Sequence, residues 1–133
     1  MLVLDTSGIV ALLVHSDADH APAVEALEAD AGPYVVPALV LAEAAYMLQR
    51  RGGARSLDLF LADIEDGAFT LDCGEEDLGR IRELALRYRS LPLGFADAAV
   101  IACAERRRGA VLTLDRRDFP VVAAERTLRL LPD

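Results

Sequence analysis

The sequence contains no lysine and no tryptophan, and all fourteen of its basic residues are arginine. Because Walker A loops, receiver domains and Schiff-base enzymes each need a lysine, these classes are excluded. No apolar run reaches the ~18 residues of a membrane-spanning helix. The start, MLVLD, lacks the basic residues of a signal peptide. We therefore expect a cytoplasmic protein with no membrane association.

Cysteine and histidine are also scarce. Cys73 and Cys103 form no CxxC motif, and both lie in or beside apolar sequence, so we expect reduced core thiols. His15 and His20 do not share a helix face at their spacing, and we expect both at the surface. The sequence has no GxSxG motif and no glycine-rich phosphate loop. Nucleophilic serine chemistry and nucleotide-loop chemistry are therefore not indicated.

Acidic residues outnumber basic ones by 22 to 14, which gives a net charge of −8. This balance argues against a simple basic nucleic-acid-binding protein, whose binding face is normally positive. The 133 residues are 53% hydrophobic. That length and composition predict one domain, residues 1–133, around one well-filled core.

Short apolar runs alternate with amphipathic segments along the chain. Thr6 and Ser7 are candidate N-caps of the first helix, Pro37 suits the first turn of the third, and Gly52-Gly53 should end it. The fifth helix should bury one face, formed by Leu78, Ile81, Leu84, Ala85 and Tyr88. We expect strands at residues 1–4, 34–36, 68–72, 110–115 and 127–131, and helices at 9–14, 16–30, 38–51, 56–66, 75–89 and 95–108.

This alternation predicts an α/β fold with a central parallel sheet of four or five strands and helices on both faces. In such sheets, ligands bind at the carboxyl ends of the strands. Reactive side chains at the points where the predicted strands end are therefore candidate site residues.

Four acids stand in otherwise apolar surroundings. Asp5 is the only charged residue among the first fourteen, and Glu43 is the only one between Val35 and Leu48. Asp97 interrupts FADAAVIACA, and Asp115 ends the uncharged run 110–114. Each has a local alternative: Asp5 could cap a helix, Asp97 could favour a helix N-terminus, and Asp115 could belong to a turn. Glu43 has no such alternative.

The predicted fold can bring these four acids to one edge of the sheet. Converging carboxylates repel one another and raise each other's pKa unless a cation neutralises them. A site made only of carboxylate oxygens suits Mg²⁺ or Mn²⁺. Such ions activate water and stabilise in-line phosphoryl displacement. The pattern therefore predicts one or two divalent ions that serve phosphodiester chemistry.

Three segments carry a family resemblance: LDTSGIVALL, VVPALVLAEAAYML and LPLGFADAAVIACAERRRGAVLTLDRRDF. Their order resembles PIN domains, specifically the VapC-type toxin ribonucleases, over Leu2 to Leu130. The resemblance implies a metal-dependent endoribonuclease of a toxin–antitoxin pair. It also implies a homodimer that a cognate antitoxin protein neutralises.

The resemblance assigns site residues one by one. It implies that Asp5 and Asp97 hold the main Mg²⁺ or Mn²⁺, while Glu43 and Asp115 orient the attacking water or hold a second ion. It gives supporting roles to four further residues: Thr6, Ser7, Thr113 and Asp118. Thr6 and Ser7 could equally be helix caps, Thr113 an ordinary strand residue and Asp118 a turn residue.

Arginines gather at residues 50–55, 106–108 and 116–117. The first two groups close predicted helices, where cations favour the helix dipole, so a structural role is expected for them. Arg116 and Arg117 adjoin Asp115 and are the better candidates for RNA phosphate contacts.

Two alternatives remain open. An aspartyl-nucleophile phosphatase is disfavoured because Ser7 stands where the second acid of such enzymes would be. A catalytically silent PIN-like module that binds RNA or protein is disfavoured because all four acids are present. Binding of a divalent metal would distinguish the nuclease from the silent module.

Overall fold

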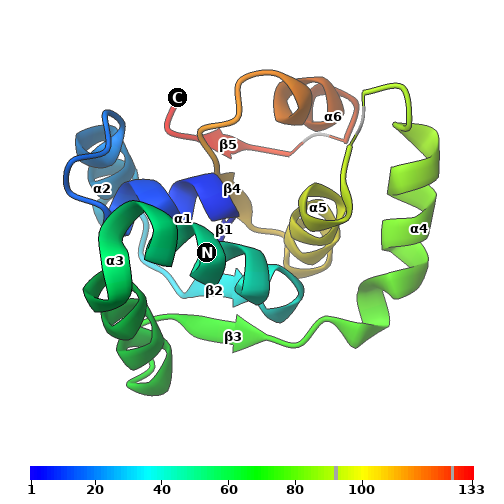
Figure 1. The fold of residues 1–133 in the computed structure, drawn as a ribbon. Helices are drawn as coiled ribbons and strands as arrows, with labels where there is room; N and C mark the ends of the chain where they lie inside the picture. The colour runs from blue at the N-terminus through cyan, green and yellow to red at the C-terminus, as the bar shows by residue number, and fades with distance from the viewer. Residues whose placement is uncertain (92, 127) are drawn as a thin grey trace.

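The computed structural model describes residues 1–91, 93–126 and 128–133. Within them, five parallel strands form one sheet in the order β3-β2-β1-β4-β5 (Figure 1). The strands are β1 Leu2–Leu4, β2 Tyr34–Pro37, β3 Thr70–Asp72, β4 Ala110–Leu112 and β5 Leu130–Leu131. The predicted central parallel sheet is confirmed. The last predicted strand is shorter than expected, and its Thr127 lies outside the described residues.

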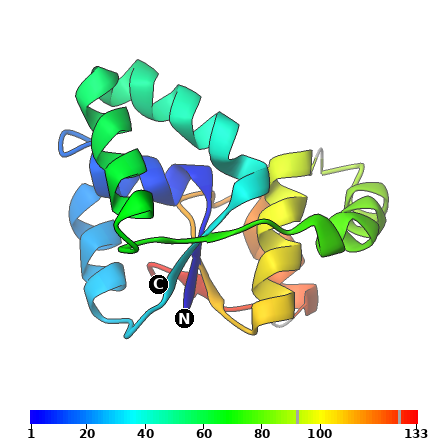
Figure 2. The same cartoon turned by 90° about the horizontal axis from the view of Figure 1, so that it is seen from below.

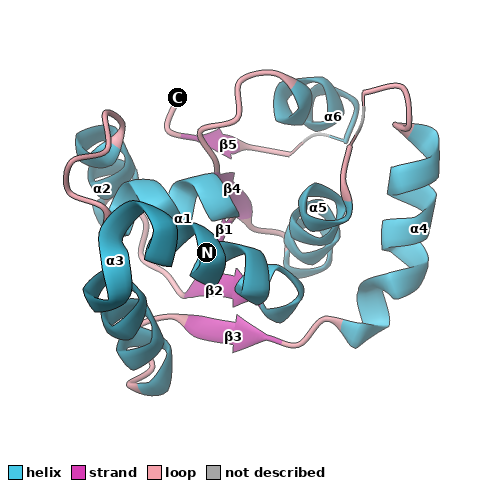
Figure 3. Cartoon of the chain, in the orientation of Figure 1, coloured by secondary structure: helices cyan, strands magenta, loops and turns pink. Residues whose placement is uncertain are grey.

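Helices cover both faces of the sheet (Figures 1, 2 and 3). One layer contains α1 Thr6–Leu13, α2 His20–Glu28 and α3 Leu41–Glu65, and the other contains α4 Leu78–Arg87, α5 Phe95–Arg107 and α6 Asp118–Arg126. Two short 3₁₀ turns, η1 Ala38–Val40 and η2 Glu75–Asp77, precede α3 and α4. Among the described residues, no helix has the length and apolar character needed to cross a membrane.

The strands are apolar on both faces because each face packs against helices. Leu2 and Leu4 of β1 belong to the core beneath α1 and α3, whereas Val3 belongs to the core beneath α5. All three are fully buried. A parallel sheet covered on both sides gives such continuous apolar runs, so a charged residue can follow only where the strand ends.

The middle of the chain contains the two expected helices and differs from the expectation at Pro37. Pro37 ends β2 instead of opening a helix. The helix end expected at Gly52-Gly53 is present within α3, which consists of two helices joined at a kink at Gly53, where φ is 75° and ψ is −176°. Glycine adopts this backbone conformation without strain, so the chain bends there and the helix resumes.

Two other features of the helices differ from the sequence-based expectations. The helix α6 was not predicted, although Asp118 and Pro120 suit its first turn and Phe119, Val122 and Ala123 are buried. In α4, Ile81, Leu84 and Tyr88 are buried as expected, but Leu78 is 49% exposed. Leu78 is the first residue of α4 and lies outside its buried face.

The scarce reactive side chains divide between core and surface. Cys103 is buried in α5 and Cys73 is exposed after β3, and both are free thiols. The expectation of a core thiol is therefore right for Cys103 and wrong for Cys73. His15 is exposed, whereas His20 is half-buried and its Nδ1 donates to the carbonyl oxygen of Ala11 over 2.8 Å.

Gly8 has no side chain, and this allows α1 to approach the end of β4. A Cβ at this position would lie 2.5 Å from the carbonyl oxygen of Leu112. Gly8→Ala should therefore lower the free energy of unfolding by about 1–3 kcal/mol, as overpacked sites do. The measurement is urea denaturation.

The matched control is Gly79→Ala on α4. A Cβ there meets no neighbouring atom within 4 Å among the described residues. Alanine should raise stability by about 0.5–1 kcal/mol through its better helix propensity. Equal effects of the two substitutions would contradict the proposed close contact.

Candidate functional site

The four acids found in apolar surroundings line one cavity. Asp5, Glu43, Asp97 and Asp115 surround a space of about 400 Å³ at the carboxyl ends of the strands. Asp5 follows β1, and Asp115 lies beyond β4. Glu43 and Asp97 belong to the first turns of α3 and α5. The convergence predicted from the sequence is therefore observed. We call this cavity the carboxylate pocket.

Asp5 has a local role as well as a place in the pocket. Its Oδ1 accepts hydrogen bonds from the backbone N–H of Gly8 and the hydroxyl of Ser7, both at 2.8 Å. Asp5 is thus the N-cap of α1, so the expectation that Thr6 or Ser7 caps this helix is wrong. The buried Asp5 still lines the pocket, so the cap and the site use the same side chain.

Thr113 and Ser7 link this carboxylate to the segment that follows β4. The hydroxyl of Thr113 donates to Asp5 Oδ2 over 2.5 Å and accepts the N–H of Asp115 over 3.0 Å. The hydroxyl of Ser7 accepts the N–H of Leu114 over 2.9 Å. Both oxygens of Asp5 are therefore oriented by hydrogen bonds: Oδ1 by the nearby Ser7 and Gly8, and Oδ2 by Thr113, 108 residues away in the sequence.

Burial is the main influence on the Asp5 carboxyl group and raises its pKa above the ordinary value of 3.8. The hydrogen bonds from Thr113, Gly8 and Ser7 oppose this effect, since they favour the charged form. The negative charge of Asp115 raises the pKa further. The network thus partly offsets the cost of placing a carboxylate in the interior.

Asp97 shows the strongest signature of concentrated negative charge. Its pKa rises from 3.8 to about 6, first through burial and then through the charges of Asp5, Asp115, Glu43 and Asp118. Asp97 is the acidic residue in the first turn of α5, whose N-cap is Gly94. The favourable position at a helix N-terminus therefore holds for Asp97 too, but burial and the neighbouring acids outweigh it and raise the pKa.

The remaining predicted acids differ in exposure and contacts. Glu43 is exposed, and Asp115 is half-buried. Asp115 Oδ1 accepts the backbone N–H groups of Arg117, at 2.8 Å, and Asp118, at 3.3 Å, so the turn role considered for it holds too. Asp118 begins α6 and does not line the carboxylate pocket, although its charge acts on Asp97.

Thr6 lines the carboxylate pocket without a protein partner. Its Oγ1 is buried and has no hydrogen-bond partner in the described part of the chain. Buried polar atoms are nearly always hydrogen-bonded. This hydroxyl therefore fits a pocket whose hydrogen bonding is completed by a bound group.

The donor set fits Mg²⁺ or Mn²⁺ in its chemistry, since both ions prefer carboxylate oxygens. In residues 1–91, 93–126 and 128–133, however, no three acidic, histidine or cysteine side chains are already arranged as a metal site. Binding an ion would thus require side-chain rotation. Glu43 is the most exposed of the four acids and has the most freedom to rotate.

Three charged residues of the carboxylate pocket were not assigned to the site from the sequence: Asp17 and Asp19 were not singled out, and a structural role was expected for Arg51. Asp17 and Asp19, from the loop between α1 and α2, line the pocket together with Arg51 of α3. Arg51 Nη2 lies 3.1 Å from Asp17 Oδ2. Glu43 and Arg51 are eight residues apart and lie on the same side of the helix. This spacing could have indicated from the sequence that Arg51 lies on the site's side of α3. The Asp17 contact joins distant segments and left no sequence signal.

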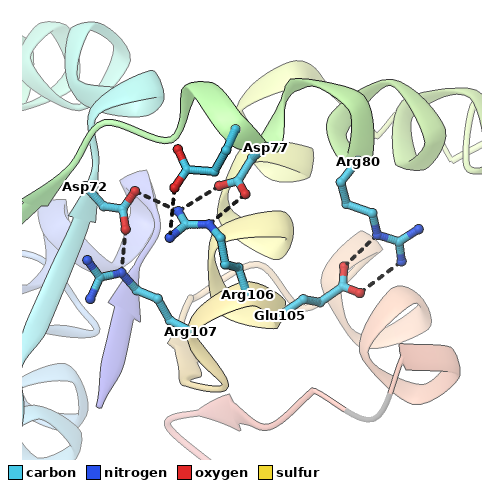
Figure 4. Close-up of polar contacts among 7 residues, drawn as sticks. Asp72, Asp77, Arg80, Glu105, Arg106 and Arg107 are labelled. Atoms are coloured by element: carbon cyan, nitrogen blue, oxygen red, sulfur yellow. Dashed lines mark hydrogen bonds and ion pairs between the residues drawn. The ribbon is translucent and has the colours of Figure 1, made fainter.

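The arginines of α5 have the structural role expected of them. Arg106 pairs with Asp77 at 2.8 Å and with Asp72 at 2.7 Å, and Arg107 also pairs with Asp72 (Figure 4). These ion pairs join the end of α5 to β3 and η2. Arg80 and Glu105 make a similar link between α4 and α5 at 2.9 Å.

Arg116 and Arg117 border a second hollow of about 520 Å³ that shares Ser7, Leu114 and Asp115 with the carboxylate pocket. Arg116 Nη1 donates to the carbonyl oxygen of Pro132 over 3.1 Å. Both arginines are exposed. Their position beside the acids agrees with the expected phosphate contact, which stays a prediction.

The family follows from comparison with known proteins. A PIN domain family model matches residues 2–125. The chain belongs to the PIN-domain family. It is 32% identical over 120 residues to Ribonuclease VapC26 of Mycobacterium tuberculosis, covering 89% of each chain. The expected resemblance to VapC-type PIN domains is therefore confirmed, as is the predicted α/β fold of one PIN-like domain.

Solved structures share the fold at lower identity. The sarcin-ricin loop cleaving toxin VapC20 of Mycobacterium tuberculosis superposes with a TM-score of 0.81 at 22% identity, covering 92% of this chain and 95% of that one. A toxin–antitoxin complex from Klebsiella pneumoniae gives 0.66 at 21% identity, covering 90% of both chains. FitAcB from Neisseria gonorrhoeae gives 0.62 at 18% identity, covering 98% and 96%.

The raised pKa of Asp97 makes the stability of the fold depend on pH. A folded-state pKa of about 6, against 3.8 for the free group, means that ionised Asp97 destabilises the metal-free fold above pH 6. This penalty shrinks as the pH falls and vanishes below about 4. Asp97→Asn should therefore raise Tm at pH 7.5 in EDTA by several degrees and have little effect at pH 3.8.

The measurement is thermal unfolding followed by circular dichroism at the two pH values. Asp58→Asn, at an exposed acid of α3, is the control and should show no such dependence on pH. A large loss of Tm in Asp97→Asn at pH 7.5 would instead identify Asp97 as a structural residue.

Proposed function

We propose that the chain is a divalent-metal-dependent endoribonuclease that hydrolyses RNA phosphodiester bonds as the toxin of a toxin–antitoxin pair. The observation that carries the proposal is the carboxylate pocket, in which acids from four separate elements meet. The likeness to Ribonuclease VapC26 and the fold shared with the toxin VapC20 support it.

In the proposed site, Asp5 and Asp97 hold the main Mg²⁺ or Mn²⁺, and Glu43 and Asp115 orient the attacking water or hold a second ion. When bound, the ion supplies an activated water and neutralises charge on the attacked phosphate. The acids contribute by their position. They come from different elements, so they can surround a phosphate that enters the pocket.

The neighbouring side chains support this arrangement. Ser7 and Thr113 fix the carboxylate of Asp5 through hydrogen bonds at 2.8 Å and 2.5 Å. Thr6 presents an unpaired hydroxyl to the pocket. Asp118 adds negative charge near Asp97. Together these contacts limit rotation of Asp5 and leave the more exposed Glu43 free to adjust to a ligand.

Arg116 and Arg117 are proposed to contact RNA phosphates beside the carboxylate pocket. They adjoin Asp115 and border the hollow that continues from the pocket. Guanidinium groups bind phosphate through paired, charge-assisted hydrogen bonds. Local arginines can therefore attract RNA although the net charge of the chain is −8.

The proposed cellular setting follows from the same family. We infer a cytoplasmic toxin of one domain, residues 1–133, that forms a homodimer and is neutralised by a cognate antitoxin protein. The fold shared with a toxin–antitoxin complex supports an antitoxin partner.

The experiment that tests this function is a calorimetric Mn²⁺ titration beside a cleavage assay on a panel of structured RNAs. The native chain, free of antitoxin, should bind Mn²⁺ and cut at least one RNA only when metal is present. Asp97→Asn should lose Mn²⁺ binding and at least 100-fold in cleavage rate, since even outer-shell changes at metal sites cost 10- to 100-fold.

Asp58→Asn is again the control and should behave as the native chain does. An absence of both Mn²⁺ binding and cleavage in the native chain would favour the alternative, a catalytically silent PIN-like module that binds RNA or protein. Metal binding by Asp97→Asn equal to that of the native chain would remove Asp97 from the proposed ligand set.

A further inference from the structure

One basic side chain lines the carboxylate pocket among the residues that the structure describes, and it is Arg51. Three pocket residues of α3, Glu43, Met47 and Arg51, recur at intervals of four and form one stripe along the helix. Arg51 lies about 12 Å along the helix from Glu43, since eight residues rise ~1.5 Å each. Its side chain leans toward the helix N-terminus, and hence toward Glu43.

Asp17 holds the guanidinium of Arg51 from the facing loop. The two groups pair at 3.1 Å, and Asp17 is the less exposed partner, at 14% against 45% for Arg51. Asp17 therefore acts as the anchor, and the guanidinium it orients faces solvent at the pocket rim. An arginine has five N–H donors, so the single contact with Asp17 leaves others available to a ligand.

A purely structural role explains this pair poorly. An ion pair with one exposed partner is solvent-screened and contributes little to stability. In addition, the pair places a cation beside the acids that surround the pocket. A guanidinium here provides an attractive contact for an anionic substrate that must approach a strongly acidic cluster.

Other arginines of the chain differ from Arg51 in their contacts. Arg50 donates to the hydroxyl of Tyr46 over 3.2 Å and does not line the carboxylate pocket. Arg106 and Arg107 are engaged by Asp72 and Asp77 at the far end of α5. Arg51 therefore combines access to the pocket with free donors.

We propose that Arg51, oriented by Asp17, binds an RNA phosphate next to the scissile one and so positions the strand across the carboxylates. This inference rests on the proposed ribonuclease function. Arg51 lines the carboxylate pocket from α3, whereas Arg116 and Arg117 border the hollow that adjoins it at Ser7, Leu114 and Asp115.

The test compares Arg51→Gln, Arg51→Lys and the matched control Arg50→Gln. Binding of a fluorescently labelled single-stranded RNA is measured by anisotropy in EDTA at several salt concentrations. Arg51→Gln should weaken binding about tenfold, the value of one charge-assisted hydrogen-bonded contact. It should also reduce the salt slope by about 0.7, as expected for one lost phosphate contact on a single strand.

Arg51→Lys keeps the charge and should restore the salt slope while regaining only part of the affinity, because lysine lacks the planar fork. Arg50→Gln should resemble the native chain. In Mn²⁺, Arg51→Gln should raise KM about tenfold and leave kcat within about threefold, since the contacted phosphate does not react.

Equal affinity and equal salt slope for Arg51→Gln and Arg50→Gln would overturn the inference, and so would an absence of RNA binding by the native chain. A native chain that binds RNA through Arg51 but never cuts it with Mn²⁺ would refute the proposed nuclease function and leave the phosphate contact standing. The two failures are thus read from different measurements.

Discussion

The buried carboxylate of Asp5 is the constraint on which the rest of the pocket depends. A carboxylate at the end of a fully buried strand is costly, and hydrogen bonds from Ser7, Gly8 and Thr113 offset that cost. These bonds require α1 to start directly after β1 and require β4 to lie beside it. The missing side chain of Gly8 allows this close approach to Leu112. The same set of contacts therefore caps α1, packs α1 against β4 and places the Asp5 carboxylate in the pocket.

The distribution of arginines explains how an acidic chain can serve an anionic substrate. At the far end of α5, Arg106 and Arg107 neutralise Asp72 and Asp77 and fasten β3 to the core. Near the carboxylate pocket the acids outnumber the arginines, and their repulsion contributes to the raised pKa of Asp97. Arginines thus neutralise the acids that hold the fold together, whereas the acids of the carboxylate pocket keep an excess of negative charge that a cation would neutralise.

The sequence predicted the sheet and the four acids because both leave strong local signals. Strands buried on both faces are continuously apolar, so Asp5 marks the carboxyl end of β1. Asp115 lies three residues beyond the end of β4, which is shorter than the predicted strand 110–115. The break at Gly53 was also predictable, because a pair of glycines suits a helix end and Gly53 adopts a non-helical conformation there. The pairing of Arg51 with Asp17 was missed, because it joins a loop to a helix through tertiary packing. Such a contact has no periodicity to detect.

The local roles of the acids explain how such a pocket is compatible with folding. Asp5 caps α1 and Asp115 closes a turn through the N–H of Arg117, so local hydrogen bonds offset part of the cost of these acids before any cation binds. Asp97 has a pKa raised to about 6 by burial and by the neighbouring acids, so its ionised form carries a cost of the cluster. Since the acids come from different elements, none can form the cluster until the sheet is complete. The negative charges are therefore brought close together only in the folded chain, where a divalent cation would neutralise them.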